Sequence, residues 1–228
     1  MNSNDKRKSV LLDHELIAEQ YGDEYGFYIE DLNVYDEFEK RLKPGSTVLD
    51  LGTGPGRTYE YFHKKGYEYI GYDFSSKMKD KAYRLHGEFP YIVDDIVNVR
   101  NHFDKCSVDN IFYVYTIFHL PREDAKKSLE DVHYILKDDG YAILSYMMGE
   151  GEEFVDEPYL GDKGKNVLYI NYFTKPEFDK LLEETNFEVL YEYSKRADAT
   201  NEIGENGNDA VFLIVKKKEW LKWLNHKI

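Results

Sequence analysis

The ten residues VLDLGTGPGR, from Val48 to Arg57, decide the fold of this chain. They begin as an apolar run typical of a buried strand, continue through three glycines at alternate positions, and lead into a helical pattern. Glycine lets the backbone turn sharply and leaves room for a ligand, because it has no Cβ atom. The first turn of the helix beyond offers unpaired N–H groups to polar ligand atoms. The stretch therefore predicts a ligand-binding turn between a strand and a helix.

An acidic residue further along the chain supports this interpretation. Residues 67–72 are predicted to form a strand, and Asp73 follows it, 21 residues after Gly52. A carboxylate at that place can accept hydrogen bonds from both hydroxyls of a ribose. The turn and the acid together indicate a cofactor that contains a nucleoside.

Two residues argue against a dinucleotide. The dinucleotide fingerprint has its third glycine where Arg57 stands, because the helix and strand pack closely there. Asp50 precedes the first glycine and would repel a pyrophosphate, whereas it would favour a cofactor with an ammonium group. S-adenosylmethionine carries an amino acid, a sulfonium cation and an adenosine, and it meets this electrostatic demand.

Strands and helices alternate along the rest of the chain, which predicts crossover connections and a mainly parallel sheet. The expected strands lie at residues 46–51, 67–72, 90–93, 110–115, 141–147, 187–193 and 210–215. The expected helices lie at residues 32–42, 57–65 and 75–85, from Pro121 to a turn at 138–140, and onward from Thr174. No helix separates the last two strands, so they should pair antiparallel at one edge. The predicted fold class is α/β: a Rossmann-like, doubly wound, mainly parallel seven-stranded sheet with an antiparallel last strand and helices on both faces.

The glycine-rich stretch resembles motif I of class I S-adenosylmethionine-dependent methyltransferases. Later segments are similar to the family's motifs and follow in its order, and the resemblance covers about residues 45–216. Those segments are GYDFSSKM (71–78), DDI (94–96), SVDNI (107–111) continuing to FHLP (118–121), LKDDGYA (136–142), and YFT (172–174) with the later LL (181–182) and NF (186–187).

The resemblance implies a set of cofactor-binding residues. Asp73 would hold the ribose and Phe74 would flank the adenine. Asp95 would accept a hydrogen bond from the adenine amino group, although Asp94 could take that role, and Tyr113 would pass close to the methionine part. The expected set is Tyr21, Asp50, Gly52, Thr53, Gly54, Gly56, Arg57, Asp73, Phe74, Met78, Asp95, Ile96 and Tyr113.

The expected reaction is the transfer of a methyl group to an O, N or C atom of a small-molecule acceptor. The leaving group is already activated, so the enzyme mainly orients the reactants and excludes water, and no catalytic residue is assigned. Phe118 stands where small-molecule members of the family usually carry the first of two histidines; His119 remains, either as a general base or as a structural histidine. A non-catalytic S-adenosylmethionine-binding or scaffold module is the alternative, and an NAD-dependent oxidoreductase is less favoured.

The chain is expected to form a single methyltransferase domain over residues 1–228. Its parts are an N-terminal helical lid (1–43), a cofactor-binding core (44–216) with an insertion at 149–169, and a C-terminal amphipathic tail (217–228) that docks on the domain or a second subunit. In the lid, Tyr21, Tyr25 and Tyr28 either pack in the core or shield a sulfonium cation. The acceptor pocket should come from residues 10–30, the insertion and the loop after Tyr193. Acidic residues of the insertion indicate a neutral or cationic acceptor, although a solvated loop explains them equally well; they are Glu150, Glu152, Glu153, Asp156 and Glu157.

Composition limits the function further. The 44 acidic residues exceed the 30 Lys and Arg, and the formal net charge of −14 disfavours nucleic-acid binding. Cys106 is the only cysteine, which indicates a reducing compartment. The polar N-terminus lacks the apolar core of a signal peptide, and the longest apolar-rich stretch, residues 111–120, is too short to span a membrane. We therefore expect a cytoplasmic monomer or homodimer with no membrane partner. No histidine spacing predicts a metal site.

Overall fold

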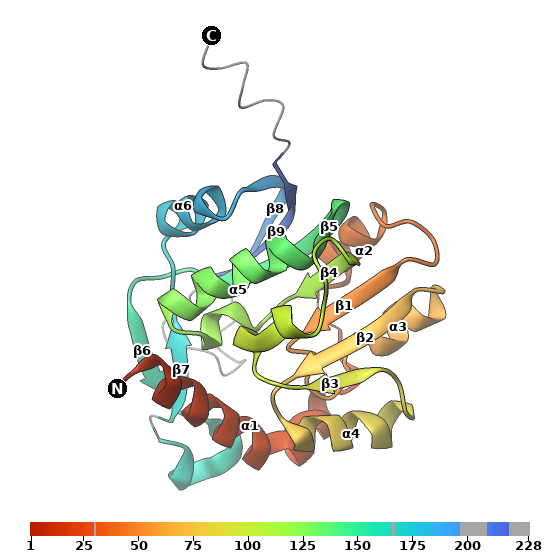
Figure 1. The fold of residues 1–228 in the computed structure, drawn as a ribbon. Helices are drawn as coiled ribbons and strands as arrows, with labels where there is room; N and C mark the ends of the chain where they lie inside the picture. The colour runs from red at the N-terminus through yellow and green to blue at the C-terminus, as the bar shows by residue number, and fades with distance from the viewer. Residues whose placement is uncertain (30, 166, 197–208, 219–228) are drawn as a thin grey trace.

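One seven-stranded sheet forms the centre of the computed structural model, which describes residues 1–29, 31–165, 167–196 and 209–218 (Figure 1). The strand order is β3-β2-β1-β4-β5-β9-β8. The strands are β1 (Thr47–Leu51), β2 (Glu68–Asp73), β3 (Tyr91–Val93), β4 (Val108–Tyr113), β5 (Leu136–Met147), β8 (Phe187–Arg196) and β9 (Asp209–Lys217). The first five pair in parallel, whereas β9 runs antiparallel to both β5 and β8. The predicted fold class is confirmed, and the edge strand is β8 because β9 lies between it and β5.

The strand order reverses at β1. The chain proceeds from β1 to β2 and β3 on one side and then places β4 on the other side. Crossovers leave the sheet in opposite directions at such a point, so a crevice opens beyond the carboxyl ends of the two central strands. The glycine turn follows β1 directly and therefore lies in that crevice.

Helices cover both faces of the sheet (Figure 1). They are α2 (Leu32–Glu39), α3 (Tyr59–Lys64), α4 (Ser76–His86), α5 (Arg122–Ile135) and α6 (Lys175–Glu184), with short 3-10 helices η1 (Ile96–Asn101) and η2 (Ile117–His119). Adjacent residues of a strand point to opposite faces. Accordingly, Ile111 belongs to the apolar cluster that contains α5 and α6, whereas Phe112 belongs to the cluster that contains α2 and α3.

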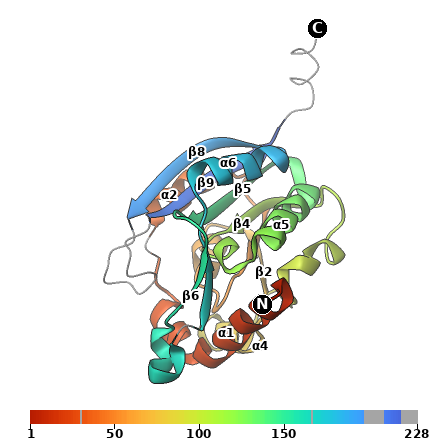
Figure 2. The ribbon, with the colours of Figure 1, turned by 90° about the vertical axis from the view of Figure 1, so that its left-hand side faces the viewer.

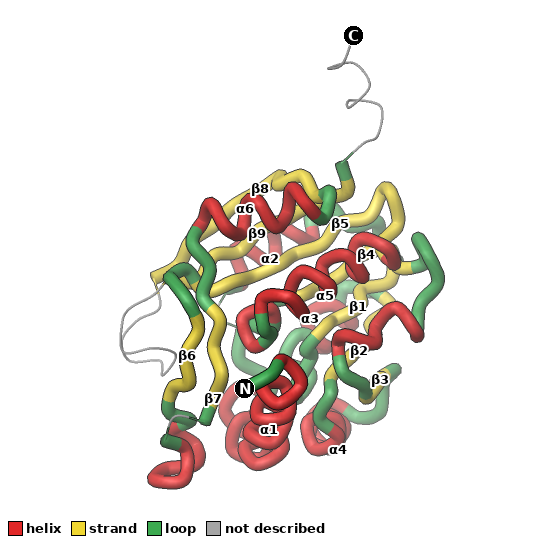
Figure 3. The backbone as a smooth tube through the Cα atoms, turned by 60° about the vertical axis from the view of Figure 1, so that its left-hand side comes forward, coloured by secondary structure: helices red, strands yellow, loops and turns green. Residues whose placement is uncertain are grey.

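A long N-terminal helix, α1 (Ser3–Tyr25), lies across the carboxyl ends of the parallel strands and packs beside α4 (Figure 2). Its other neighbours come from the insertion, which folds as β6 (Glu152–Val155), η3 (Pro158–Gly164) and β7 (Leu168–Asn171). Figure 3 shows β6 and β7 as a separate antiparallel pair beside α1. The sequence analysis predicted no strands in the insertion; they are explained by the apolar side chains of Leu168 and Ile170, which join the core.

The sequence prediction was wrong about residues 138–140. A turn was expected there, but α5 ends at Ile135 and β5 begins at once with Leu136. The exposed Asp138 forms an ion pair with Lys217 of β9. This residue is therefore polar because it lies at the exposed end of the sheet, and it does not mark a turn. Gly140 is required for another reason, because a Cβ atom there would lie 2.2 Å from the main-chain oxygen of Asp109 on β4.

Two expected segments lie outside the described residues. They are residues 197–208 of the loop after Tyr193 and residues 219–228 of the C-terminal tail, while Lys217 belongs to β9. None of the helices within the described ranges is both long and apolar enough to cross a membrane.

The close approach at Gly140 is testable. Gly140→Ala should lower the free energy of unfolding by about 2 kcal/mol, because the added methyl overlaps a main-chain atom fixed by strand pairing. Gly66→Ala is the control: Gly66 has φ +86° but open space around its Cβ position, so only the left-handed backbone costs about 1 kcal/mol. Urea unfolding of both variants measures the difference. Equal losses would contradict the steric explanation.

Candidate functional site

A cavity of about 450 Å³ lies at the carboxyl ends of the parallel strands, beneath α1. The glycine turn and the ends of β2 and β4 form its floor, while α1 and η3 form its cover. Most of the predicted cofactor-binding residues line it: Tyr21, Gly52, Thr53, Gly54, Arg57, Asp73, Phe74, Met78, Asp95 and Ile96. Asp50, Gly56 and Tyr113 do not line it.

The glycine turn has the backbone conformation that its sequence requires. Gly52, Gly54 and Gly56 have φ values of +80°, +52° and +80°, which other residues rarely adopt. A Cβ on Gly52 would lie 2.0 Å from the Thr116 hydroxyl oxygen, so the turn touches the segment after β4. At Gly54, a Cβ would meet nothing within 4 Å. The turn is longer than expected, because α3 begins only at Tyr59.

Asp73 is buried at the end of β2 and faces the cavity. One oxygen accepts from the Gly54 N–H at 3.0 Å and the other from the Ser75 N–H at 2.9 Å. A carboxylate has about four acceptor positions, so these two bonds leave positions for ligand hydroxyls. Burial raises the pKa of Asp73 to about 6, partly opposed by these N–H groups, and the group is therefore mostly ionised at neutral pH.

Asp50 lies behind the turn. Its carboxylate accepts hydrogen bonds from the hydroxyls of Thr58 and Tyr69, each at 2.5 Å. Burial raises the pKa of Asp50 to about 6, so it is mostly ionised at neutral pH. The structure thus places its charge near the cavity without exposing it on the wall.

Gly56 and Tyr113 occupy structural positions. A Cβ on Gly56 would lie 3.0 Å from the His86 ring, so this glycine lets α4 approach the turn. Tyr113 is buried and donates to the Ser128 hydroxyl of α5 at 3.0 Å. It points to the α5 face because strand residues alternate, and Val114, Tyr115 and Thr116 line the cavity instead.

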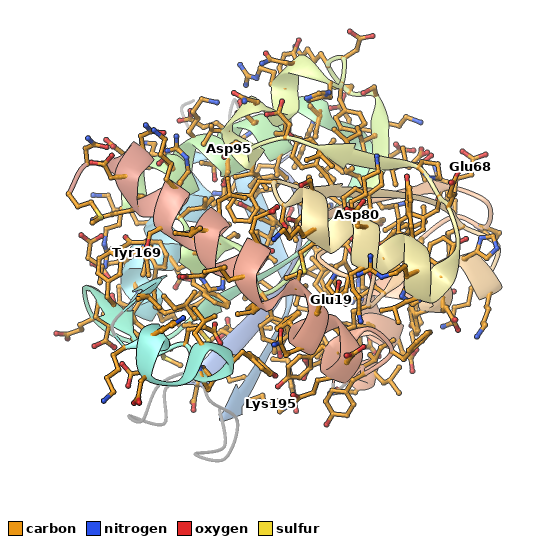
Figure 4. All side chains as sticks on the ribbon, turned by 90° about the horizontal axis from the view of Figure 1, so that it is seen from below. Glu19, Glu68, Asp80, Asp95, Tyr169 and Lys195 are labelled. Atoms are coloured by element: carbon orange, nitrogen blue, oxygen red, sulfur yellow. The ribbon has the colours of Figure 1, made fainter. Side chains whose placement is uncertain are left out.

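The two acids after β3 have different partners. Asp95 accepts from the Arg7 Nε–H of α1 at 2.9 Å, and Arg7 also pairs with Asp124. Asp94 bonds to the Asn98 amide and to His102 at 2.8 Å. Figure 4 shows Asp95 beside the N-terminal half of α1, and both acids line the cavity, so Asp95 differs from Asp94 by its contact with α1.

Arg57 is a half-buried cation in the cavity wall. Its guanidinium lies 3.4 Å from the Tyr35 hydroxyl and 5.0 Å from the centre of the Tyr115 ring. Within the described ranges, no carboxylate lies within salt-bridge distance (4.0 Å) of it. The buried acids Asp31 and Asp50 act on it only at longer range, so an anionic group of a ligand would be its first directly paired carboxylate.

The α1 contacts were mostly missed by the sequence reasoning. Tyr21, Tyr25 and Tyr28 do line the cavity, with Tyr21 and Tyr25 in contact at 4.8 Å between ring centres. The remaining α1 wall residues are Arg7, Val10, His14 and Ile17. With Tyr21, they recur at intervals of three and four, which is the spacing of one helix face. This spacing could have indicated that one face of the helix lines the cavity. It was not recognised in the sequence because the face mixes charged, polar and apolar residues.

The three segments expected to form the acceptor pocket all reach the cavity. Beside α1, they contribute Glu157, Tyr159 and Leu168 from the insertion and Lys195 from β8. Of the insertion's acids, only Glu157 lines the cavity, and Glu152 instead pairs with Lys6 of α1.

Two buried carboxyl groups, one on α1 and one in the insertion, act on each other electrostatically. Asp13 is 4 % exposed, and its Oδ2 has no hydrogen-bond partner within the described part of the chain. Burial, assisted by the charge of nearby Glu157, raises the pKa of Asp13 to about 7. The contribution of Asp13 to folding stability therefore depends on pH.

Comparisons with known proteins agree with this geometry. The family model of the methyltransferase domain matches residues 26–192. No curated protein sequence matches the chain. A solved S-adenosylmethionine-dependent methyltransferase from Methanosarcina mazei superimposes with a TM-score of 0.69 at 19 % identity, covering 84 % of this chain and 99 % of that one.

Two further structures share the fold. The 1,6-didemethyltoxoflavin-N1-methyltransferase of Burkholderia thailandensis, with 1,6-didemethyltoxoflavin and S-adenosylhomocysteine bound, gives a TM-score of 0.72 at 16 % identity, covering 96 % of this chain and 92 % of that one. The [4+2]-cyclase SpnF gives 0.61 at 12 % identity, covering 82 % and 80 %. These identities show a shared fold and leave the acceptor open.

The Asp13–Glu157 pair makes a testable prediction. Between about pH 4 and 7 the folded protein keeps a proton on Asp13 that the unfolded chain has lost, so this group's contribution to stability falls as pH rises. The side chain of Asp13→Asn does not titrate. The melting temperature of this variant minus that of the wild type should therefore be more positive at pH 8 than at pH 5. The exposed Asp80→Asn on α4 is the control and should show no such trend. A gain that is equal at both pH values would contradict the assignment.

Proposed function

The chain belongs to the methyltransferase domain family, and from this premise we propose that it transfers a methyl group to an O, N or C atom of a small-molecule acceptor. The chain is a class I S-adenosylmethionine-dependent methyltransferase, and S-adenosylmethionine is its cofactor. Family membership removes the NAD-dependent oxidoreductase alternative.

One observation carries the proposal for a small acceptor. A single covered cavity brings together the glycine turn, Asp73, and the walls supplied by α1 and the insertion. Its volume of about 450 Å³ lies in the range of pockets that hold small ligands, roughly 300 to 1,000 Å³. Cofactor and acceptor have to share this space, which favours a small acceptor over a macromolecule. The Burkholderia protein of the same fold, whose structure contains 1,6-didemethyltoxoflavin, supports the same class.

The residues present fit the cofactor. Asp73 has acceptor positions left for the ribose hydroxyls, and the open space at Gly54 admits a ligand against the backbone. We assign the carboxylate of the methionine part to Arg57, which has no carboxylate of the described residues within 4.0 Å, and its ammonium group to the field of Asp50. Asp95 would accept from the adenine amino group beside Arg7. Tyr21, Thr53, Phe74, Met78 and Ile96 would pack around these groups.

The cofactor supplies an activated methyl group, so the chain's own residues contribute by orienting the reactants and excluding water. The turn and Asp73 hold one reactant, while the α1 lid, within residues 1–43, excludes water from the reacting atoms. Holding two reactants in line reduces the barrier by about 7 kcal/mol or more in favourable cases. This contribution requires no metal, and the described residues contain no cluster of metal ligands.

Cofactor binding should depend on Asp73. We expect S-adenosylmethionine to bind the wild type with a micromolar dissociation constant, and Asp73→Asn to weaken binding about 10- to 100-fold. The variant keeps the shape of the side chain but loses the charge that strengthens the ribose hydrogen bonds, worth about 1.5 to 3 kcal/mol. Isothermal titration calorimetry measures both, with Asp80→Asn as the control. A wild type that does not bind would overturn the proposed function.

Arg57 should recognise only the amino-acid end of the cofactor. Arg57→Gln should weaken S-adenosylmethionine about tenfold or more but leave 5′-methylthioadenosine, which lacks the carboxylate, nearly unaffected. The ratio of the two affinities, again from calorimetry, separates recognition from any general loss of folding. If both ligands weaken equally, Arg57 does not contact the carboxylate.

A further inference from the structure

One acidic residue of the cavity wall has no part in the proposed cofactor site. Glu157 immediately precedes η3 in the insertion and is 4 % exposed. One of its oxygens accepts a hydrogen bond from the Tyr159 N–H at 3.1 Å, which caps η3. Of the insertion's acids, it alone lines the cavity. A carboxylate buried at a cavity wall favours a ligand with a positive charge.

The other titratable acids and the histidines of the cavity do not offer such a charge to an acceptor. We assigned Asp73 to the ribose and Asp95 to the adenine of the cofactor. Asp94 already bonds two side chains of the segment that contains η1. Burial lowers the pKa of His119 to about 3, so this ring is neutral. Glu157 is therefore the acid of the wall that can serve the acceptor.

A second carboxyl group lies near Glu157 without lining the cavity. Asp13 of α1 is 4 % exposed, and its Oδ2 has no hydrogen-bond partner within the described part of the chain. Burial and the charge of Glu157 raise the pKa of Asp13 to about 7. Among the described residues, Glu157 is the charged group that acts on Asp13. A cation beside Glu157 would offset their repulsion, so both groups could then be ionised.

Three tyrosine rings line the same part of the cavity. Tyr21 and Tyr25 belong to α1, and their ring centres are 4.8 Å apart. Tyr159 belongs to η3, and its ring centre lies 6.3 Å from that of Tyr21. The Tyr159 hydroxyl donates to Glu24 at 2.6 Å, so its polar tip is already bonded. Aromatic ring faces attract a cation within about 6 Å of the ring centre.

The charges near Tyr21 differ in sign. Burial raises the pKa of Tyr21, and the charges of Arg57 and Glu157 shift it in opposite directions. Both charged groups therefore lie within electrostatic range of this ring. We assigned Arg57 to the carboxylate of the methionine part. Glu157 can accordingly receive a positive group of the second reactant.

The charge of the whole chain supports a cationic ligand. The formal net charge is −14, and a field of this sign attracts cations. Within the described ranges, no third acid, histidine or cysteine joins the pair to form a cluster of metal ligands. An ammonium group, which donates its own N–H bonds, needs no such cluster.

We propose that Glu157, Tyr21 and Tyr159 form an ammonium subsite, and that the acceptor is a small molecule with a protonated amino group. Glu157 binds the ammonium group, and the two rings pack against it. Asp13 is a positioning residue, which gives up its proton when the amine binds and so strengthens the negative charge of the subsite. This inference rests on the proposed methyltransferase function and specifies its substrate class.

The ammonium group is an anchor and not the methylated atom. A protonated amine has no lone pair to form a bond with the methyl carbon, so the methyl group goes to another O, N or C atom of the same molecule. The amine brings one positive charge, and Asp13 can release one proton. The net charge of the subsite then stays nearly constant, which keeps the electrostatic cost of a buried ammonium group small.

2-Phenylethylamine and 2-phenylethanol are the probes for this subsite. They share a ring and a two-carbon chain, but the amine is protonated at neutral pH, as lysine is, and the alcohol is neutral. In calorimetry on the S-adenosylhomocysteine complex, the amine should bind about tenfold tighter than the alcohol or better. Glu157→Gln should remove most of this preference, because the amide oxygen still caps η3 but carries no charge. Glu153→Gln, exposed on β6, is the matched control and should keep it.

Proton release tests the part played by Asp13. At pH 7 the wild type should release about half a proton for each amine bound, because Asp13 titrates near that pH. Calorimetry in two buffers with different ionisation enthalpies measures this release. Asp13→Asn should still prefer the amine but release no proton.

S-adenosylhomocysteine should bind each variant as it binds the wild type, which shows that the variant is folded. Four results would each overturn the inference: equal binding of the two probes by the wild type, no binding of either, a preference that survives in Glu157→Gln, or a release that survives in Asp13→Asn. If the wild type does not bind S-adenosylhomocysteine, the proposed function fails. A missing amine preference in a complex that does bind it removes the ammonium subsite alone.

Discussion

The contact between Gly52 and Thr116 determines the geometry of the cavity. These residues follow β1 and β4, the two central strands, and no side chain fits between them, since a Cβ on Gly52 would lie 2.0 Å from the Thr116 oxygen. The contact holds the glycine turn beside the end of β4. From there, η2 carries His119 toward α1, and β2 carries Asp73 to the other side of the turn. One main-chain turn therefore fixes the positions of His119 and Asp73 relative to each other.

Local patterns allowed the floor of this site to be predicted. The turn at 48–57 and the acid at Asp73 are set by neighbouring residues along the chain: a buried strand, glycines with positive φ, and a strand end. The alternation of strands and helices sufficed for the sheet, because each crossover constrains the next strand. The same reasoning did not predict that Tyr113 points toward α5. The sequence locates the end of a strand only to within a residue or two, and successive side chains of a strand point to opposite faces of the sheet.

Long-range contacts explain the rest of what was missed. The start of β5 at Leu136 depends on pairing with Val108 of β4. Residues 138–140 resemble a turn, and nothing in the neighbouring sequence indicates a strand there instead. The lid residues Arg7 and His14 depend on partners about 90 to 105 positions away, Asp95 and His119. A polar helix face usually indicates solvent. Here it faces a cavity, and only the fold distinguishes the two.

The arrangement of α1 has a consequence for catalysis. Arg7, His14 and Tyr21 recur every seven residues, so they lie on one face and span about 21 Å along the helix axis. Arg7 donates a hydrogen bond to Asp95, and His14 contacts His119. Tyr21 lines the cavity together with Arg57. A rigid helix positions all three together, so the proposed cofactor and acceptor sides of the cavity depend on the same element. Because this one element covers the cavity, it can align the reactants and exclude water together, which is what methyl transfer requires of the protein.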